Sequence, residues 1–220
     1  MAHRSPAVVF DCDGVLLDSE KAWTRAETRL FARYGRTYGI EEKLLLIGGS
    51  LEETAGALED LLDRPGGSDD LQHELLELAA AELAGPVEPM PGALHLVREL
   101  HDLGRPMAVA SNSERRLVDL ALNGSGLADA FEAVVAGDEV PNPKPAPDLY
   151  LEACRRLGTS PQEAVAVEDS PRGAAAARAA NMFVIGIPYL PELELEAEAD
   201  LVAPSLEDPA VRSALGLSAR

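Results

Sequence analysis

The fold is decided by residues 8–20, which read VVFDCDGVLLDSE. Three apolar residues, two of them β-branched, predict a buried strand over 8–10, and the turn-forming residues after them end it. Asp11 and Asp13 therefore stand at the carboxyl end of a central strand, the edge at which open α/β sheets bind ligands. Two carboxylates this close are unfavourable unless a cation or a shared proton separates them. The segment predicts a metal or proton-sharing site, with an Asx-rich turn as the alternative.

The length and the net charge of the chain limit the number of domains and the kinds of partner that we expect. The 220 residues can hold one sizeable domain and a smaller insertion. Apolar residues make up 46% and the formal net charge is −19, which suits a soluble globular protein. Such acidity argues against nucleic acid and anionic membranes as partners, and no protein partner is evident. An anionic substrate then needs local cations or helix N-termini at its site.

Targeting and redox signals are weak. We expect no signal peptide, because the first strand follows closely on Met1, and no apolar run approaches transmembrane length. Cys12 and Cys154 are too few for a disulfide framework and lack metal-ligand spacing. We expect both to be small core residues in a reducing, cytoplasmic protein.

Between the first strand and Pro89 the pattern is helical. Helices are expected over 19–34, 41–46, 51–62 and 68–83, with glycine- and proline-rich breaks between them. Trp23 and Phe31 are expected in the apolar interior of this unit, with a surface that contacts substrate as the alternative. Residues 18–88 are therefore expected to form a helical cap domain, inserted into a core domain of residues 1–17 and 89–220.

From Gly92 onward helices and strands alternate. Strands are expected at 106–110, 134–135, 164–167 and 183–187, with an edge strand at 200–202; helices are expected at 93–103, 114–122, 147–157 and 171–180. This alternation predicts a parallel sheet with helices on both faces, a Rossmann-like α/β fold. The Glu-rich residues 191–199 are expected to be a surface loop or short helix.

Polar residues follow four of the apolar runs, and the carboxyl ends of parallel strands meet at one edge of a sheet. In chain order they are Asp11 and Asp13, Ser111, Lys144 in a proline-bracketed loop, and Glu168 with Asp169. Each alone is ordinary: a helix cap, a solvated lysine or a capped turn. The combination in this order is far more specific than any of its members.

The order resembles the four motifs of the haloacid dehalogenase (HAD) superfamily, in its Mg²⁺-dependent phosphohydrolase branch. The resemblance covers nearly the whole chain, and the helical insertion sits where that family carries its cap. Residues 11–15 (DCDGV) and 168–173 (EDSPRG) are most similar to the group that contains β-phosphoglucomutase, phosphoglycolate phosphatase and small sugar-phosphate phosphatases.

The resemblance implies roles for the aspartates and a metal. Asp11 would attack phosphorus and form an aspartyl-phosphate, while Asp13 would protonate the leaving alkoxide and later deprotonate water. Mg²⁺ prefers oxygen ligands, and Asp11 and Asp169 would bind it directly. The backbone carbonyl of Asp13 would face the metal, and Glu168 would act through water or through another ligand.

The resemblance also implies phosphate contacts. Ser111, with backbone N–H groups near Asn112, would bind phosphoryl oxygens. Lys144 would hold both Asp11 and the phosphoryl group, on a loop stiffened by its prolines.

The cap would set substrate choice. The mutases carry a basic Lys-Gly-Val-Ser-Arg-type segment there, and the matching residues 47–51 read IGGSL. Gly48, Gly49 and Ser50 remain candidate substrate contacts, but the flanking cations are missing. From residue 44 to residue 89 the formally cationic side chain is Arg64, in a loop expected at the far end of the cap.

The function predicted is a Mg²⁺-dependent phosphatase for a small phosphomonoester, such as a sugar phosphate or related metabolite. A sugar phosphomutase shares the first steps and is the alternative enzyme. A haloacid dehalogenase is disfavoured because that branch uses one Asp and does not need the metal apparatus. A phospho-receiver module is the alternative of another class, but it lacks a helical insertion and carries its phosphorylated Asp on a later strand.

Overall fold

The computed structural model describes residues 6–218 and contains one six-stranded sheet. All of its strand pairs are parallel and the strand order is β3-β2-β1-β4-β5-β6. The strands are β1 (Ala7–Phe10), β2 (Met107–Ser111), β3 (Ala133–Ala136), β4 (Ala164–Glu168), β5 (Phe183–Gly186) and β6 (Leu201–Val202). The predicted Rossmann-like α/β fold is confirmed, with β1 in the middle of the sheet.

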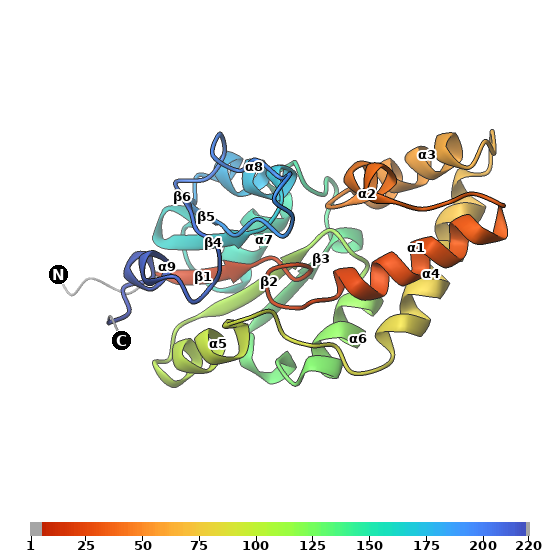
Figure 1. Cartoon of the computed structure of the whole chain (residues 1–220). Helices are drawn as coiled ribbons and strands as arrows, with labels where there is room; N and C mark the ends of the chain where they lie inside the picture. The colour runs from red at the N-terminus through yellow and green to blue at the C-terminus, as the bar shows by residue number, and fades with distance from the viewer. Residues whose placement is uncertain (1–5, 219–220) are drawn as a thin grey trace.

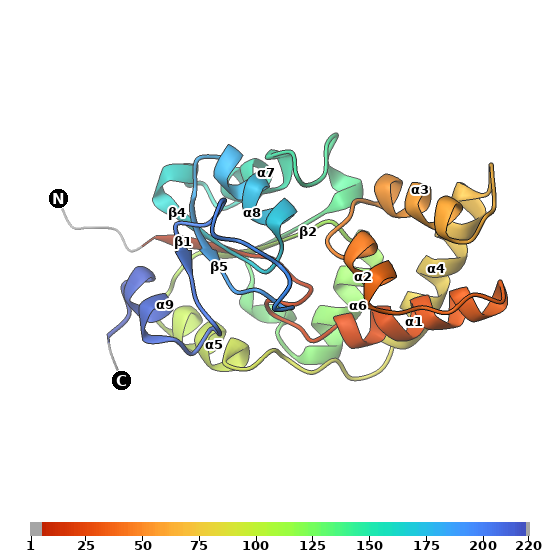
Figure 2. The same cartoon turned by 45° about the horizontal axis from the view of Figure 1, so that its top comes forward.

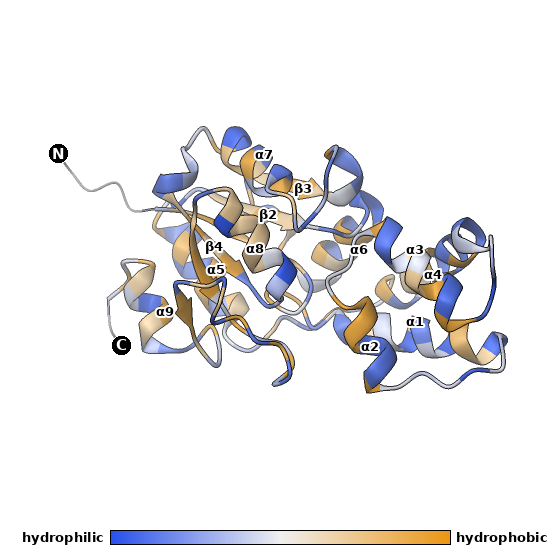
Figure 3. Ribbon diagram, turned by 90° about the horizontal axis from the view of Figure 1, so that it is seen from above, coloured by the Kyte–Doolittle hydropathy of each residue, from blue (hydrophilic) through white to orange (hydrophobic). Residues whose placement is uncertain are grey.

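Helices cover both faces of this sheet, as Figures 1 and 2 show. One face carries α5 (Ala93–Asp102), α6 (Arg115–Ser125) and α9 (Pro209–Ala214), and the other carries α7 (Asp148–Arg156) and α8 (Pro171–Ala179). Side chains alternate along a strand, so Val8 and Phe10 pack on the first face and Val9 on the second. Burial on both faces explains why the strands read as unbroken apolar runs, and Figure 3 colours β2, β3 and β4 mostly as hydrophobic.

Four helices follow β1, and we refer to them as the cap: α1 (Glu20–Arg33), α2 (Ile40–Leu46), α3 (Leu51–Leu61) and α4 (Ser68–Leu83). Figure 1 shows it beyond the carboxyl ends of the strands, with α1 and α4 side by side. Two linkers join it to the sheet and run together. The Asp18 N–H donates to the Glu88 carbonyl at 2.9 Å, and the Met90 N–H donates to the Leu16 carbonyl at 2.9 Å.

Every helix and strand expected from the sequence is present, and the differences are local. The short helix α9 was not expected, and residues 191–199 form turns with Leu195 buried against Gly186. Cys12 and Cys154 are free and buried, as predicted. No helix within residues 6–218 has the length and apolar character needed to cross a membrane.

The cap interior contains buried polar groups. Lys43 of α2 donates to Glu20 and to Thr24 of α1, with its Nζ 2.7 Å from an oxygen of each. Glu27, one turn further along α1, is 6% exposed and accepts a hydrogen bond from the Tyr38 hydroxyl. Burial raises the pKa of Glu27 to about 7, and the hydrogen bond from Tyr38 opposes that rise without cancelling it.

Glu27 makes the stability of the fold depend on pH. Its pKa rises from 4.5 to about 7 on folding, so the folded protein binds the extra proton between these values. The free energy of unfolding therefore falls as pH rises through this window, with a contribution from Glu27 on the order of 3 kcal/mol. Glu27→Gln keeps an acceptor for Tyr38 but has no proton to lose, so its urea-unfolding free energy depends less on pH.

The matched control is Glu52→Gln, which removes an exposed carboxylate of α3. Its pH profile is expected to run parallel to that of the wild type. A Glu27→Gln profile that also runs parallel between pH 4.5 and 7 would contradict the buried, proton-binding state of Glu27.

Candidate active site

A cavity of about 90 Å³ lies between the carboxyl edge of the sheet and the cap. This volume has room for several water molecules or a small organic group. From the core it is lined by polar residues that include Asp11, Asp13, Ser111, Asn112, Lys144 and Asp169. The structure thus brings together residues from three strand ends and from the loop before α7.

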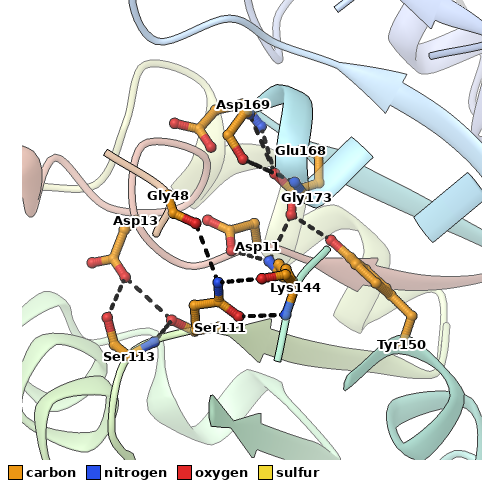
Figure 4. Close-up of polar contacts among 12 residues, drawn as sticks. Asp11, Asp13, Gly48, Ser111, Ser113, Lys144, Tyr150, Glu168, Asp169 and Gly173 are labelled. Carbon is orange, nitrogen blue, oxygen red and sulfur yellow. Dashed lines mark hydrogen bonds and ion pairs between the residues drawn. The ribbon is translucent and has the colours of Figure 1, made fainter. Parts of the chain in front are cut away.

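Lys144 lies at the centre of the buried charges. Its Nζ is 2.5 Å from Asp11 Oδ1 and 2.6 Å from Glu168 Oε1, and its side chain is 3% exposed (Figure 4). Burial disfavours the ammonium, but the two carboxylates outweigh this and raise the pKa of Lys144. The loop is fixed by Asn112, whose Oδ1 accepts from the Lys144 N–H at 2.8 Å. Lys144 therefore remains charged and held in place.

Both oxygens of Glu168 are occupied by donors. Oε1 accepts from Lys144 and from the Tyr150 hydroxyl at 2.7 Å, and Oε2 accepts from the backbone N–H groups of Asp169 at 3.0 Å and Ser170 at 3.3 Å. Tyr150 is fully buried, with Lys144 Nζ 5.2 Å from its ring centroid. Glu168 is thereby fixed as the partner that orients Lys144.

Two glycines leave room for these carboxylates. A Cβ on Gly173 would lie 1.8 Å from Glu168 Oε1, so only glycine lets α8 begin this close to the strand end. A Cβ on Gly14 would lie 2.2 Å from Asp169 Oδ2, and Gly14 also has a φ of +82°. Both glycines belong to the two segments on which the resemblance rests.

The acidic groups form a cluster whose chemistry suits a metal ion. Oxygens of Asp11, Glu168 and Asp169 lie within 4.8 Å of one another, and all three residues are buried. Burial raises the pKa of Asp11 and of Asp169, and neighbouring carboxylates raise both further. One ammonium faces three carboxylates, so a divalent cation that favours oxygen ligands fits the charge and the donors.

Asp13 is held separately by three hydroxyl groups. Ser19 donates to Oδ1 at 2.5 Å, while Ser111 and Ser113 donate to Oδ2 at 3.2 and 3.1 Å. Figure 4 shows its carboxylate turned toward Ser111 and Ser113. The side chain is therefore positioned in the cavity wall but outside the carboxylate cluster.

The cap residues singled out from the sequence fall into different places. Gly48 and Gly49 line the cavity, and Asn112 Nδ2 donates to the Gly48 carbonyl at 3.2 Å, which ties cap to core. Ser50 lies outside the cavity wall, and its hydroxyl accepts from the Glu53 N–H to cap α3. Trp23 is partly buried against the hydrophobic core cluster and also lines the cavity.

Several residues of the site escaped the sequence reasoning. Ser19, Ser113 and Tyr150 bind Asp13 or Glu168, and Lys43 lines the cavity. Tyr150 belongs to an apolar helix face, where nothing in the sequence shows the direction of its hydroxyl. Lys43 lies one residue before residues 44–89, the part of the cap in which Arg64 is the formally cationic side chain. The sequence signal for it is a single lysine directly before LLLIGG.

Comparisons with known proteins show the family to which the chain belongs. A family model described as haloacid dehalogenase-like hydrolase matches residues 8–187. The chain is 35% identical over 190 residues to fructose-1-phosphate phosphatase YqaB from Escherichia coli (strain K12), a match that covers 86% of this chain and 100% of that protein. It is 32% identical over 206 residues to the bifunctional riboflavin kinase/FMN phosphatase of Arabidopsis thaliana, where the match covers 93% of this chain but 54% of the relative.

A solved crystal structure has the same fold as this chain. The crystal structure of CbbY from Rhodobacter sphaeroides in complex with phosphate aligns with a TM-score of 0.80 and 30% identity, covering 94% of this chain and 98% of CbbY. The fold, the family model and the relatives therefore agree. The chain belongs to the haloacid dehalogenase-like hydrolase family.

Proposed function

We propose that this protein is a Mg²⁺-dependent phosphatase that hydrolyses a small phosphomonoester through an aspartyl-phosphate on Asp11. The observation that carries the proposal is the pair of aspartates in one cavity, with Asp11 held by Lys144 and Asp13 held by three hydroxyls. Its relatives include phosphatases of sugar phosphates and other small phosphomonoesters, which supports a substrate of that kind.

We further assign residues 18–88 to a cap domain and residues 1–17 with 89–220 to a core domain. The two adjacent linkers support this division, because the chain enters and leaves the cap side by side, which is a suitable position for a hinge. A cytoplasmic location is supported by the two free thiols, Cys12 and Cys154.

Asp11 would supply the nucleophile. Lys144 holds Oδ1, which leaves Oδ2 to attack phosphorus. As this bond forms, the bond between phosphorus and the leaving alcohol breaks, and Asp13 in its protonated form gives its proton to the leaving oxygen. Asp13 then takes a proton from water, the water oxygen attacks phosphorus, and the bond to Asp11 breaks. Phosphate and the alcohol are released, and both aspartates return to their starting states.

Positive charge would come from two sources. Mg²⁺, held by Asp11, Asp169 and the Asp13 carbonyl, would supply Lewis-acid charge that reduces the repulsion between the carboxylate and the phosphoryl oxygens. Lys144 adds a second, fixed charge beside Asp11. The Ser111 hydroxyl, which donates its one proton to Asp13 in this structure, would turn to a phosphoryl oxygen when substrate binds, and backbone N–H groups near Asn112 would donate to the phosphoryl oxygens as well. Glu168 would act through Lys144, since both of its oxygens already accept hydrogen bonds.

A phosphomutase is the alternative enzyme. It needs a cationic binding site for the second phosphate of a bisphosphate intermediate. The cations among the described cavity-lining residues are Lys43 and Lys144, and each is ion-paired to a carboxylate. Arg64 lies outside the cavity wall, with its guanidinium 5.1 Å from the Tyr34 ring centroid. This distribution favours hydrolysis. The helical cap over the cavity also disfavours a phospho-receiver module, because a receiver lacks such an insertion.

The proposal is tested with p-nitrophenyl phosphate, assayed with Mg²⁺ and after removal of the metal. Turnover is expected only with Mg²⁺, and Asp11→Asn is expected to reduce it on the order of a thousandfold or more, since an amide is a poor nucleophile. Asp102→Asn, at an exposed end of α5, serves as the control and keeps wild-type turnover. Metal-dependent turnover by a natively folded Asp11→Asn protein would exclude this role for Asp11.

A second prediction concerns Tyr150 as a positioning residue. Tyr150→Phe removes one donor from Glu168 while the ring remains, so Lys144 is less firmly oriented. A hydrogen bond to a charged group is worth about 1.5–3 kcal/mol, and we expect kcat to fall by about tenfold or more with KM nearly unchanged.

The matched control is Tyr34→Phe, which removes a tyrosine hydroxyl that donates to Glu74 on the cap, outside the cavity wall. It is expected to leave kcat and KM unchanged. Equal kcat values for the Tyr150→Phe and wild-type proteins would show that the hydroxyl only stabilises the fold.

A further inference from the structure

The cap side of the cavity contains charged groups that the proposed phosphoryl chemistry does not use. They are Glu20 and Glu27 of α1 and Lys43 of α2, and all three line the cavity. The uncharged polar side chains Thr54 and Gln72 line it as well, beside apolar groups such as Trp23 and Leu76. This face is where the alcohol portion of a phosphomonoester would lie once its phosphoryl group is at Asp11.

Lys43 is already neutralised within this face. Its Nζ is 2.7 Å from Glu20 Oε2, and the two side chains are 11% and 10% exposed. Thr24 accepts a second hydrogen bond, and the Nζ lies 5.8 Å from the ring centroid of Tyr189. An ammonium has three N–H groups, so one remains for a neutral acceptor. An incoming anion, by contrast, would have to compete with Glu20.

Glu27 adds a further carboxylate. Its Oε2 accepts from Tyr38, and its Oε1 has no hydrogen-bond partner within residues 6–218. Above the pKa of about 7 of Glu27, the cap face therefore carries two carboxylates and one ammonium. Glu27 can accept a hydrogen bond from a hydroxyl group but repels a carboxylate or phosphate placed beside it.

We infer that this face selects phosphomonoesters whose leaving group is an uncharged, hydroxylated carbon chain and rejects those whose leaving group carries a second anion. Substrate hydroxyls would donate to Glu27 and accept from Lys43, and the carbon chain would pack on Trp23 and Leu76. Rejection follows from the missing counter-charge, because a buried anion without a partner is strongly disfavoured. The inference rests on the proposed phosphatase function and narrows its substrate class.

A matched pair of substrates tests it directly. Glycerol 3-phosphate and 3-phosphoglycerate differ by a hydroxymethyl group in place of a carboxylate. The assay is run near pH 8, above the pKa of about 7 of Glu27, so that its carboxylate is charged. Wild-type kcat/KM is expected to be at least about tenfold higher for glycerol 3-phosphate. Inhibition of p-nitrophenyl phosphate hydrolysis by each compound measures the same preference as binding.

Variants assign the preference to the cap face. Glu20→Gln removes the carboxylate that pairs with Lys43, so the ammonium becomes available to an anionic leaving group. The kcat/KM for 3-phosphoglycerate should rise, and the ratio of kcat/KM for glycerol 3-phosphate to that for 3-phosphoglycerate should fall by about tenfold. Glu27→Gln should narrow it less, because Lys43 stays paired. Glu52→Gln makes the same change in net charge at an exposed position of α3 and should leave the ratio unchanged.

Each outcome decides the inference. The inference is overturned if the wild-type kcat/KM for 3-phosphoglycerate equals or exceeds that for glycerol 3-phosphate. It is also overturned if the ratio of the two kcat/KM values is the same in the wild type and in natively folded Glu20→Gln and Glu27→Gln proteins. If Glu20→Gln does not fold, the wild-type preference and Glu27→Gln decide alone. Absence of any Mg²⁺-dependent hydrolysis of p-nitrophenyl phosphate would instead refute the proposed function itself.

Discussion

The ion pairs that Lys144 makes with Asp11 and Glu168 are the interaction on which the rest of the site depends. Burying three carboxylates next to one another is strongly unfavourable, and Lys144 offsets part of that charge at 2.5 and 2.6 Å. The parallel sheet makes the meeting possible, because the ends of β1 and β4 are neighbours. The charge that Lys144 leaves uncompensated is what suits the site to a divalent cation.

The surrounding structure supports that arrangement. Gly14 and Gly173 allow the backbone to pass close to the carboxylates. The Tyr150 hydroxyl and the backbone N–H groups of Asp169 and Ser170 donate to Glu168. On the cap side of the cavity, Lys43 and Glu20 form a second buried ion pair, in which a lysine again neutralises a carboxylate. The two pairs would have different consequences under the proposed function: the first would orient the nucleophile beside a metal site, and the second would leave the leaving-group side without an unpaired cation.

The sequence was sufficient for the fold and for the core of the site because both follow from strand ends. Apolar runs located the strands, and parallel pairing then brought Asp11, Ser111 and Asp169 to one edge. Side chains on helices were harder, since Tyr150 and Lys43 look like core and surface residues until the helix positions are known. The cavity itself forms only when the cap meets the core, so Trp23 and Ser50 could not be placed from spacing alone.

The central claim, that Asp11 carries the phosphoryl group, is tested most directly by trapping that state. Asp13→Asn with p-nitrophenyl phosphate and Mg²⁺ should form the adduct, because this leaving group needs little acid, and then stall for want of a base. Mass spectrometry of a quenched and digested reaction should find one phosphoryl group on the peptide that contains Asp11. The double variant Asp11→Asn/Asp13→Asn should show none. A folded Asp13→Asn protein without the adduct, or with it on another residue, would contradict the account.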